Sequence, residues 1–487
     1  MTAREIHALL PLMILVAAAL AAMLGLAVRR SHGFTLAVTV AGLLAALVSL
    51  AFLPAGPTRV TPLLLVDRFA IFYTGLIVGA TLAVALLAHG YWDKRVKVPC
   101  EEFYILLLLA TAGSAALTAS VHFASFFLSL EILSASLYAM IAYERDRPAA
   151  VEAGIKYLVL AGGSSAVLLF GIALAYGRTG TLDMAAAASR LAGGGLDALT
   201  LAAVAMILVG VGFKLALVPF HLWAADVYEG APAPTAAYAA TVSKGAVFVL
   251  LVRLAATMDI QANPQLQATL AAAAVVTMFA GNLLALLQTN LKRLLAYSSI
   301  ANMGYLLVAF LAAGQVALTA VGFYLAAYFI TVLGAFGVMI VLSPAERDFD
   351  RLEDYVGLSR RHPVLAAVFS IMLLSLAGMP LTAGFVGKFY LLAAGVSSNL
   401  WVLAAALVVT STISLFYYLR FIAAAYSRAS QVPGALTDVF PSHIGGPMGP
   451  RLPRLSRLTL AVLVVLLLWL GLYPGPLIHI IQAAVAP

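Results

Sequence analysis

Long apolar stretches alternate with short polar connections along almost the whole chain. Apolar runs of about 20 residues are typical of helices that cross a bilayer, and we predict 14 such spans. Their approximate ranges are 6–28, 34–53, 66–89, 103–120, 122–143, 154–176, 198–219, 233–256, 266–288, 293–313, 316–342, 363–392, 399–426 and 457–484. Backbone groups in lipid must be satisfied within the protein, and these runs are too long and continuous for barrel strands. The pattern therefore predicts an all-α polytopic membrane protein.

Composition supports a single integral membrane domain over residues 1–487. The chain is 63% hydrophobic and only 10% charged, whereas a soluble domain carries about 25% charged residues. Its one cysteine, Cys100, cannot form a disulfide within the chain or supply a cysteine-based iron–sulfur or zinc site. The run at 6–28 is too long for a signal-peptide core, so we interpret it as the first membrane helix.

The basic residues are distributed unequally between the two sides of the membrane. Of the 28 Lys and Arg residues, 19 fall in the odd-numbered connections and six in the even-numbered connections and termini. The positive-inside rule then places the odd connections in the cytoplasm and both termini in the periplasm of a bacterial inner membrane. The net charge of +8 comes from this asymmetry and does not indicate nucleic-acid binding, because the basic residues are spread over many loops.

Two predicted spans contain helix breakers. The span 198–219 runs into Pro219, and the span 363–392 contains Gly378, Pro380 and Gly384. Proline removes a backbone donor and glycine lets the backbone leave the helical region. Discontinuous helices at corresponding places in two halves are typical of inverted-repeat transporters. We therefore expect three N-terminal helices in 1–90, inverted five-helix repeats at 103–256 and 266–426, and a C-terminal helix at 457–484.

Four charged side chains lie inside apolar segments. They are Glu131, Lys214, Lys244 and Lys388. A charge at the centre of a bilayer costs about 3 kcal/mol or more, so the default interpretation of such residues is an ion or proton path. Burial disfavours the charged ammonium and a nearby carboxylate favours it, so a Glu–Lys pair can hold or release a proton as it opens and closes.

Structural roles remain open for some of these residues. Glu131 could serve helix packing through hydrogen bonds, and Lys388 could extend its amine to an interface. Lys244 is the least suited to that explanation because it lies in mid-span. His221 directly follows the break at Pro219 and could relay protons between Lys214 and Lys244. A histidine at a helix end is more often structural, and the other histidines receive no role.

The stretch 213–244, FKLALVPFHLWAADVYEGAPAPTAAYAATVSK, resembles the antiporter-like membrane subunits of respiratory complex I, the proton-pumping NADH:quinone oxidoreductase. The motif DVYEGAP at 226–232 is similar to the corresponding sequence of the N type of these subunits and differs from that of the L and M types. Further matches are LKRLLAYSSIANMGYLL at 291–307, LEDYVGL at 352–358 and AGMPLTAGFVGKFYLL at 377–392. Ala225 and Ala233-Pro234 depart from the family pattern in the connection near 219–233, away from the charged residues.

The resemblance implies specific roles for the charged residues. The family's fifth-span glutamate falls on Glu131, its seventh- and eighth-span lysines on Lys214 and Lys244, and its twelfth-span terminal lysine on Lys388. It also implies a proton-translocating subunit that binds no cofactor, with NADH, FMN, iron–sulfur clusters and quinone handled by other subunits. The implied partners are the other membrane-arm subunits, including neighbouring antiporter-like ones, and lipid.

Three alternatives remain at this point. A subunit of a multi-chain sodium/proton antiporter would share the fold and the buried charges, but the Tyr228-Glu229-Gly230 motif argues against it. A membrane subunit of a related hydrogenase is a second alternative, because other chains choose the electron donor. The third, a purely structural scaffold, does not explain four buried charges.

Overall fold

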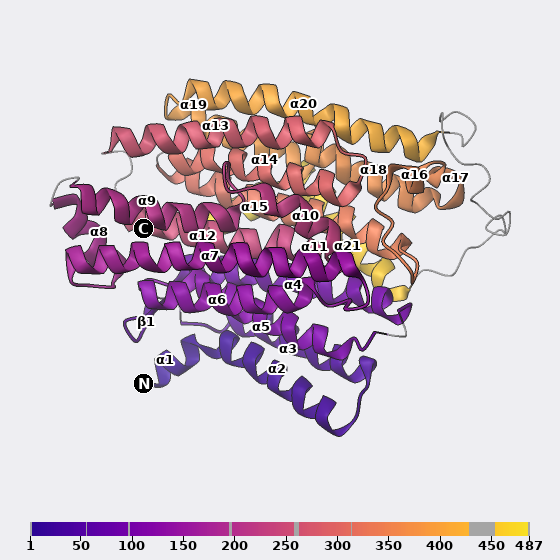
Figure 1. Ribbon diagram of the computed structural model, residues 1–487, viewed down its shortest axis with the longest axis horizontal. Helices are drawn as coiled ribbons and strands as arrows, with labels where there is room; N and C mark the ends of the chain where they lie inside the picture. The colour runs from indigo at the N-terminus through magenta and orange to yellow at the C-terminus, as the bar shows by residue number, and fades with distance from the viewer. Residues whose placement is uncertain are drawn as a thin grey trace.

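The computed structural model describes residues 2–54, 56–95, 98–193, 197–257, 263–312, 314–427 and 453–485. Long helices lie side by side in one bundle (Figure 1), and 13 of those described are long and apolar enough to cross a membrane. The remaining predicted span, 363–392, is present as two helices that are individually too short to count. The all-α polytopic fold is confirmed.

The N-terminal part of the chain contains the only strands in the described residues. Its elements are α1 (Ala3–Ala8), α2 (Leu10–Val28), α3 (His32–Leu50), β1 (Thr58–Val60), β2 (Leu64–Val66), α4 (Arg68–Asp93), α5 (Glu101–Ala119), α6 (Phe123–Ile141), α7 (Pro148–Thr179), α8 (Met184–Gly193), α9 (Ala198–Leu215), α10 (Leu222–Gly230), α11 (Ala233–Tyr238), the π-helix η1 (Ala239–Ser243) and α12 (Lys244–Thr257). Strands β1 and β2 pair antiparallel, with Arg59 opposite Leu65.

The C-terminal part is helical wherever it is described. Its elements are α13 (Pro264–Leu286), α14 (Leu291–Leu311), α15 (Gly314–Leu342), α16 (Leu352–Tyr355), α17 (Leu358–Arg361), α18 (Pro363–Ala377), α19 (Ala383–Ser397), α20 (Trp401–Tyr426), α21 (Arg454–Leu472) and α22 (Gly475–Val485). Both chain ends lie toward the left of Figure 1 and α16 and α17 toward the right.

Short polar side chains start many of these helices. Asp67 accepts a hydrogen bond from the backbone N–H of Ala70, and Asn290 accepts one from that of Arg293. Such caps satisfy backbone donors that the first helical turn leaves free. Proline occupies the first turn of α7, α13 and α18, where its missing N–H costs nothing.

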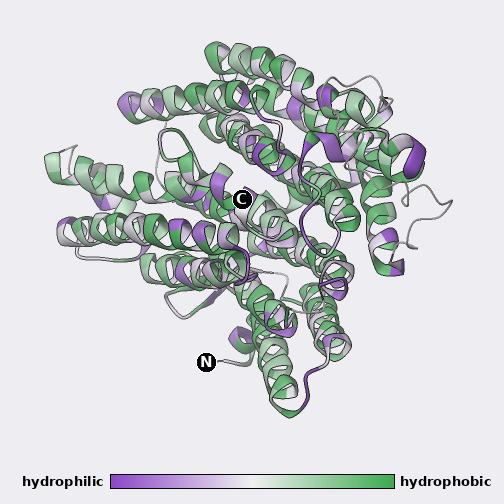
Figure 2. Cartoon of the chain, turned by 45° about the vertical axis from the view of Figure 1, so that its right-hand side comes forward, coloured by the Kyte–Doolittle hydropathy of each residue, from purple (hydrophilic) through white to green (hydrophobic). Residues whose placement is uncertain are grey.

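Burial separates central helices from peripheral ones. In the most apolar 18-residue segment of each helix, 94% of the residues are buried for Ala233–Ala255 and for α14 and 89% for α15, against 28% for α2 and 33% for α3. Hydrophobic colour covers most of the helical surface in Figure 2, and the polar colour gathers mainly near helix ends. The stretch Ala233–Ala255, α14 and α15 therefore form the interior of the bundle. The outer helices present apolar faces suited to lipid or other membrane subunits.

The structure differs from the predicted spans in several places. The run at 6–28 is divided at Leu9 into α1 and α2, and the predicted single C-terminal helix at 457–484 is divided into α21 and α22 before Gly475. Pro474 lies in this second interruption, where its missing N–H would break helical hydrogen bonding. The connection 343–362 contains two one-turn helices, α16 and α17. Residues 428–452, between α20 and α21, lie outside the described residues.

Candidate functional site

Lys214 lies in the last turn of α9, directly before an interruption of the backbone. The helix ends at Leu215, Ala216 adopts the left-handed conformation with φ 56°, and α10 begins only at Leu222. Pro219 lies within this interruption. The Lys214 side chain is buried, and its Nζ donates to Ser134 Oγ at 2.7 Å.

Glu131 lies one helical turn before Ser134 on α6. It is half-buried, and its Oε1 accepts a hydrogen bond from Ser165 Oγ of α7 at 2.6 Å. The structure therefore places the glutamate and Lys214 against neighbouring positions of one helix. Each has its own hydroxyl partner, and Ser134 separates the two charges along α6.

Lys244 is buried at the junction of a π-helix and an α-helix. Its Nζ donates to Ser299 Oγ of α14 at 2.8 Å, and Tyr328 Oη of α15 donates to the same oxygen at 2.8 Å. The π-helix η1 ends at Ser243, immediately before the lysine. Such bulges open the regular i to i−4 ladder and often occur at functional sites. Sequence reasoning missed this feature because the residues of η1 itself, AATVS, include no proline or glycine.

His221 lies in the interruption between α9 and α10. The residue is buried, and its Nδ1 has no hydrogen-bond partner among the described residues. The hydroxyl of buried Tyr228, on α10, is likewise unpaired, and its ring centre lies 5.5 Å from Lys244 Nζ. These polar groups leave hydrogen-bonding capacity close to Lys244, which suits a hydrated passage.

Lys388 lies in the second turn of α19, after the interruption between α18 and α19. Gly378 and Leu381 both have positive φ angles there, 87° and 70°, and Pro380 lies between them. The Lys388 Nζ donates to the free carbonyl of Ala377 at the end of α18, at 3.1 Å. A Cβ on Gly384 would lie 2.0 Å from the Ser375 carbonyl oxygen, so only glycine fits that close approach.

We call Lys214, Lys244 and Lys388 the lysine axis. Each member is buried and donates to a neutral oxygen. Lys214 and Lys388 lie beside helix interruptions, and Lys244 lies beside the π-helix η1. No described carboxylate lies within 4.0 Å of any of the three amines. A lysine held only by neutral acceptors can lose its proton without leaving an unpaired buried carboxylate behind.

Polar side chains of α14 occupy the space between Lys244 and Lys388. Asn302 accepts a hydrogen bond from Tyr324 and donates to Ser298 O at 2.8 Å. Tyr305 accepts one from Asn282 at 2.9 Å, and its ring centre lies 5.1 Å from Lys388 Nζ. These residues stand in the quoted stretch 291–307, but uncharged side chains in an apolar helix gave no signal strong enough to select them.

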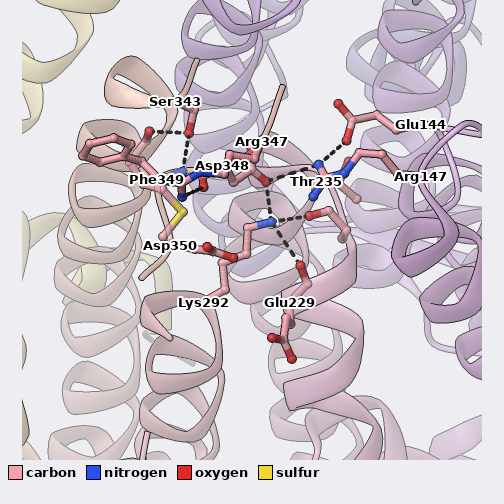
Figure 3. A network of polar contacts seen from close by, with 12 residues as sticks. Glu144, Arg147, Glu229, Thr235, Lys292, Ser343, Arg347, Asp348, Phe349 and Asp350 are labelled. Atoms are coloured by element: carbon pink, nitrogen blue, oxygen red, sulfur yellow. Dashed lines mark hydrogen bonds and ion pairs between the residues drawn. The ribbon is translucent and has the colours of Figure 1, made fainter. Parts of the chain in front are cut away.

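A second polar group lies at the end of the bundle that holds α16 and α17, and we call it the Asp348 cluster (Figure 3). Its members are Tyr91, Arg95, Glu144, Arg147, Lys292 and Asp348. The Asp348 side chain is fully buried and binds Lys292, Arg95 at 3.0 Å and the Tyr91 hydroxyl at 2.7 Å.

The Asp348 cluster joins segments that are distant in sequence. Lys292, at the start of α14, also donates to the carbonyls of Glu229, at the end of α10, at 3.2 Å and of Ala231, just after α10, at 2.7 Å. Arg95, after α4, binds Glu144 at 2.8 Å. The sequence of the connection 343–362 does not by itself reveal this cluster, because the other members come from the end of α4, the α6–α7 connection and the start of α14.

The pKa values of two neighbouring carboxyl groups in this loop, Asp348 and Asp350, are shifted in opposite directions. Burial raises the pKa of Asp348, but Lys292 and Arg95 outweigh burial and hold it below its ordinary value. Burial also raises the pKa of Asp350, and here Lys292 and Asn290 do not compensate, so the pKa stays above its ordinary value. Asp348 is therefore a structural anion, and Asp350 is the carboxyl group that more readily accepts a proton.

Comparison with known proteins identifies relatives along almost the whole chain. Residues 120–414 match the family model described as NADH:quinone oxidoreductase/Mrp antiporter, TM. The chain is 46% identical over 492 aligned positions to an NADH-quinone oxidoreductase subunit N of Ectopseudomonas mendocina, covering 99% of this chain and 97% of that one.

Solved structures show the same fold. A chain of respiratory complex I from Thermus thermophilus with bound aureothin is 34% identical, with a TM-score of 0.81, over 97% of this chain and 99% of that one. A chain of the membrane-bound sulfane sulfur reductase, an archaeal respiratory membrane complex, is 25% identical with a TM-score of 0.84, over 99% and 97%.

Proposed function

We propose how protons move through this chain, which belongs to the antiporter-like membrane subunits of NADH:quinone oxidoreductase as a subunit N. The protons that it translocates move along the lysine axis. Glu131 begins the proposed path, His221 relays between Lys214 and Lys244, and polar side chains of α14 continue it to Lys388. The partners of the subunit are the other subunits of complex I.

The observation that carries this proposal is that three buried amines have only neutral hydrogen-bond acceptors, two of them beside helix interruptions and one beside a π-helix. Structural buried charges in this protein have opposite charges beside them, as Lys292 has Asp348. The axis lysines have hydroxyl and carbonyl oxygens instead. Because desolvation disfavours the ammonium form, small changes at the interruptions can change whether each amine holds its proton.

The topology that we propose follows from the charge distribution. The Asp348 cluster and the loops around it would face the cytoplasm, and both termini the periplasm of the inner membrane. The paired interruptions in α9–α10 and α18–α19 support two inverted five-helix repeats at 103–256 and 266–426. The subunit would carry no redox group itself, so purified alone it should oxidise no NADH and hold no flavin.

The test replaces Lys244 by methionine, which removes the titrating group and keeps most of its volume. We expect proton pumping by the assembled enzyme in vesicles to fall severely. Electron transfer should fall with it, since a blocked proton path holds back a tightly coupled redox step. Lys156→Met is the matched control, because this lysine is 44% exposed and pairs with Glu152 and Asp226 at the protein surface.

Two outcomes would contradict the proposal. One is normal pumping by Lys244→Met in a fully assembled complex. The other is an equal loss in Lys156→Met, which would show that losing any lysine disturbs the enzyme. Ser299→Ala provides a graded variant: it removes the hydroxyl that accepts from Lys244 and Tyr328, so pumping should fall less than in the methionine variant.

A further inference from the structure

Two histidines and an aspartate converge where α3 begins and α4 ends. Within the described residues, His32, His89 and Asp93 are the one group of three or more such side chains placed to hold a metal ion. Each offers one ligand atom, and these atoms lie within 4.8 Å of one another. His89 and Asp93 are four residues apart on α4 and therefore share a helix face.

The spacing of the ligand atoms suits a small divalent cation. His32 Nδ1 lies 2.8 Å from Asp93 Oδ1, and His89 Nε2 lies 3.4 Å from Asp93 Oδ2. Zinc binds nitrogen and oxygen ligands at about 2.0–2.1 Å in tetrahedral geometry, which places ligand atoms about 3.3 Å apart. The two measured separations lie on either side of this value, so the three side chains are close enough together for one cation to contact all of them.

The surroundings support the ligands. Tyr104 Oη of α5 lies 2.9 Å from His32 Nε2, so a hydroxyl can fix the ring while Nδ1 faces the metal. Metal-bound histidines usually have such a partner on the second nitrogen. Nearby Arg30 pairs with Glu102 at 2.7 Å and with Glu101 at 3.6 Å. The positive charge of Arg30 is therefore balanced by these carboxylates and does not oppose a metal ion at the site.

The site is also accessible. The side chains of His32, His89 and Asp93 are 16%, 24% and 52% exposed, so an ion can reach them from solution. Two imidazoles and one carboxylate leave a fourth position for water, and this ligand set favours Zn²⁺ over Mg²⁺ or Ca²⁺.

We propose that His32, His89 and Asp93 form a binding site for a divalent transition-metal ion, best suited to Zn²⁺, which links the start of α3 to the end of α4. The site lies apart from the lysine axis in sequence, on helices that contribute none of the axis residues. A bound ion would fasten two helices whose ligands are otherwise joined only by hydrogen bonds.

The first test measures zinc in the purified, assembled complex. The enzyme is stripped with a chelator, equilibrated with Zn²⁺ and desalted, and its zinc content is measured by elemental mass spectrometry. We expect His89→Gln and Asp93→Asn each to lose one equivalent of zinc per complex relative to wild type. His479→Gln is the matched control and should lose none, because this exposed histidine on α22 belongs to no ligand group.

A spectroscopic test separates ligation from a structural role. In a Cys100→Ser background, His89→Cys places a thiolate at the site, and added Co²⁺ should then give a sulfur-to-cobalt charge-transfer band absent from the Cys100→Ser parent. Equal zinc content in wild type, His89→Gln and Asp93→Asn would overturn the proposal. So would a cobalt spectrum of the cysteine variant without the thiolate band.

Discussion

Replacing Asp348 by asparagine tests the interpretation of the Asp348 cluster most directly. Asparagine keeps the size and one acceptor oxygen but removes the negative charge that faces Lys292 and Arg95. The side chains of Asp348 and Lys292 are both 0% exposed, so no water can compensate the stranded cation. Removing one partner of a buried ion pair costs about 3–5 kcal/mol, and we expect a loss in that range.

The matched control is Asp350→Asn, two residues away in the same loop. Asp350 is partly buried and accepts from Asn290 at 2.9 Å, but its raised pKa means that the neutral form is already favoured relative to an ordinary carboxyl. Exchanging it for a neutral amide should therefore cost about 1 kcal/mol or less. Both variants exchange an aspartate for an asparagine in the same loop, and they differ only in the charged groups around the replaced side chain.

The measurement is the thermal stability of the complex in detergent, read as the temperature at which half of this subunit remains assembled. A loss of 3 kcal/mol corresponds to about a 100-fold change in an equilibrium constant, so Asp348→Asn should lower this temperature clearly and Asp350→Asn only slightly. Lys292→Met combined with Asp348→Asn should cost less than the two single changes added together, because the pair is coupled. Equal effects of the two asparagine variants, or simple additivity, would refute the reasoning.

The pH dependence of Asp348 has a definite sign. Because its pKa in the folded protein is lowered, its stabilising contribution is fully present above the ordinary carboxyl pKa and is lost as pH falls through the folded value. Acidification toward that range should thus destabilise wild type more than Asp348→Asn. A parallel loss in both proteins would contradict the assignment of Asp348 as a structural anion.

Three further predictions concern the proton path, the topology and the second helix interruption. Lys214→Ala and Glu131→Ala should each abolish most pumping while the complex assembles, and near-normal pumping by either in a vesicle assay would remove that residue from the path. A single cysteine at Asp146, an exposed loop position, should resist an impermeant thiol reagent in intact cells and react in inside-out vesicles; labelling in intact cells would reverse the orientation. Gly384→Ala should lower the thermal stability of the complex because its Cβ would meet a backbone carbonyl at 2.0 Å. Gly162→Ala on α7, with open space around it, should be neutral or slightly stabilising, and equal effects of the two alanines would contradict the packing of the α18–α19 interruption.

The sequence by itself determined the helical membrane fold and selected the charged residues of the candidate site. Apolar runs of bilayer length leave few options in a solvent without hydrogen-bonding groups, so the positions of the spans could be predicted, although the runs 6–28 and 457–484 are each divided into two helices. Helix breakers indicated the interruptions near Lys214 and Lys388, because proline and glycine act through the local backbone. A charge in an apolar run is conspicuous wherever it lies, and this selected Lys244.

Only the tertiary structure decided which groups face one another. Nothing in the sequence singles out Ser299 or Tyr328. They contact the Lys244 site because α14 and α15 pack against the end of η1. His32 and His89 are 57 residues apart, and Asp348 meets Arg95 across 253 residues. Local patterns report the solvent and the backbone conformation of each segment. The partners of a polar side chain depend instead on how distant helices pack, and no single segment contains that information.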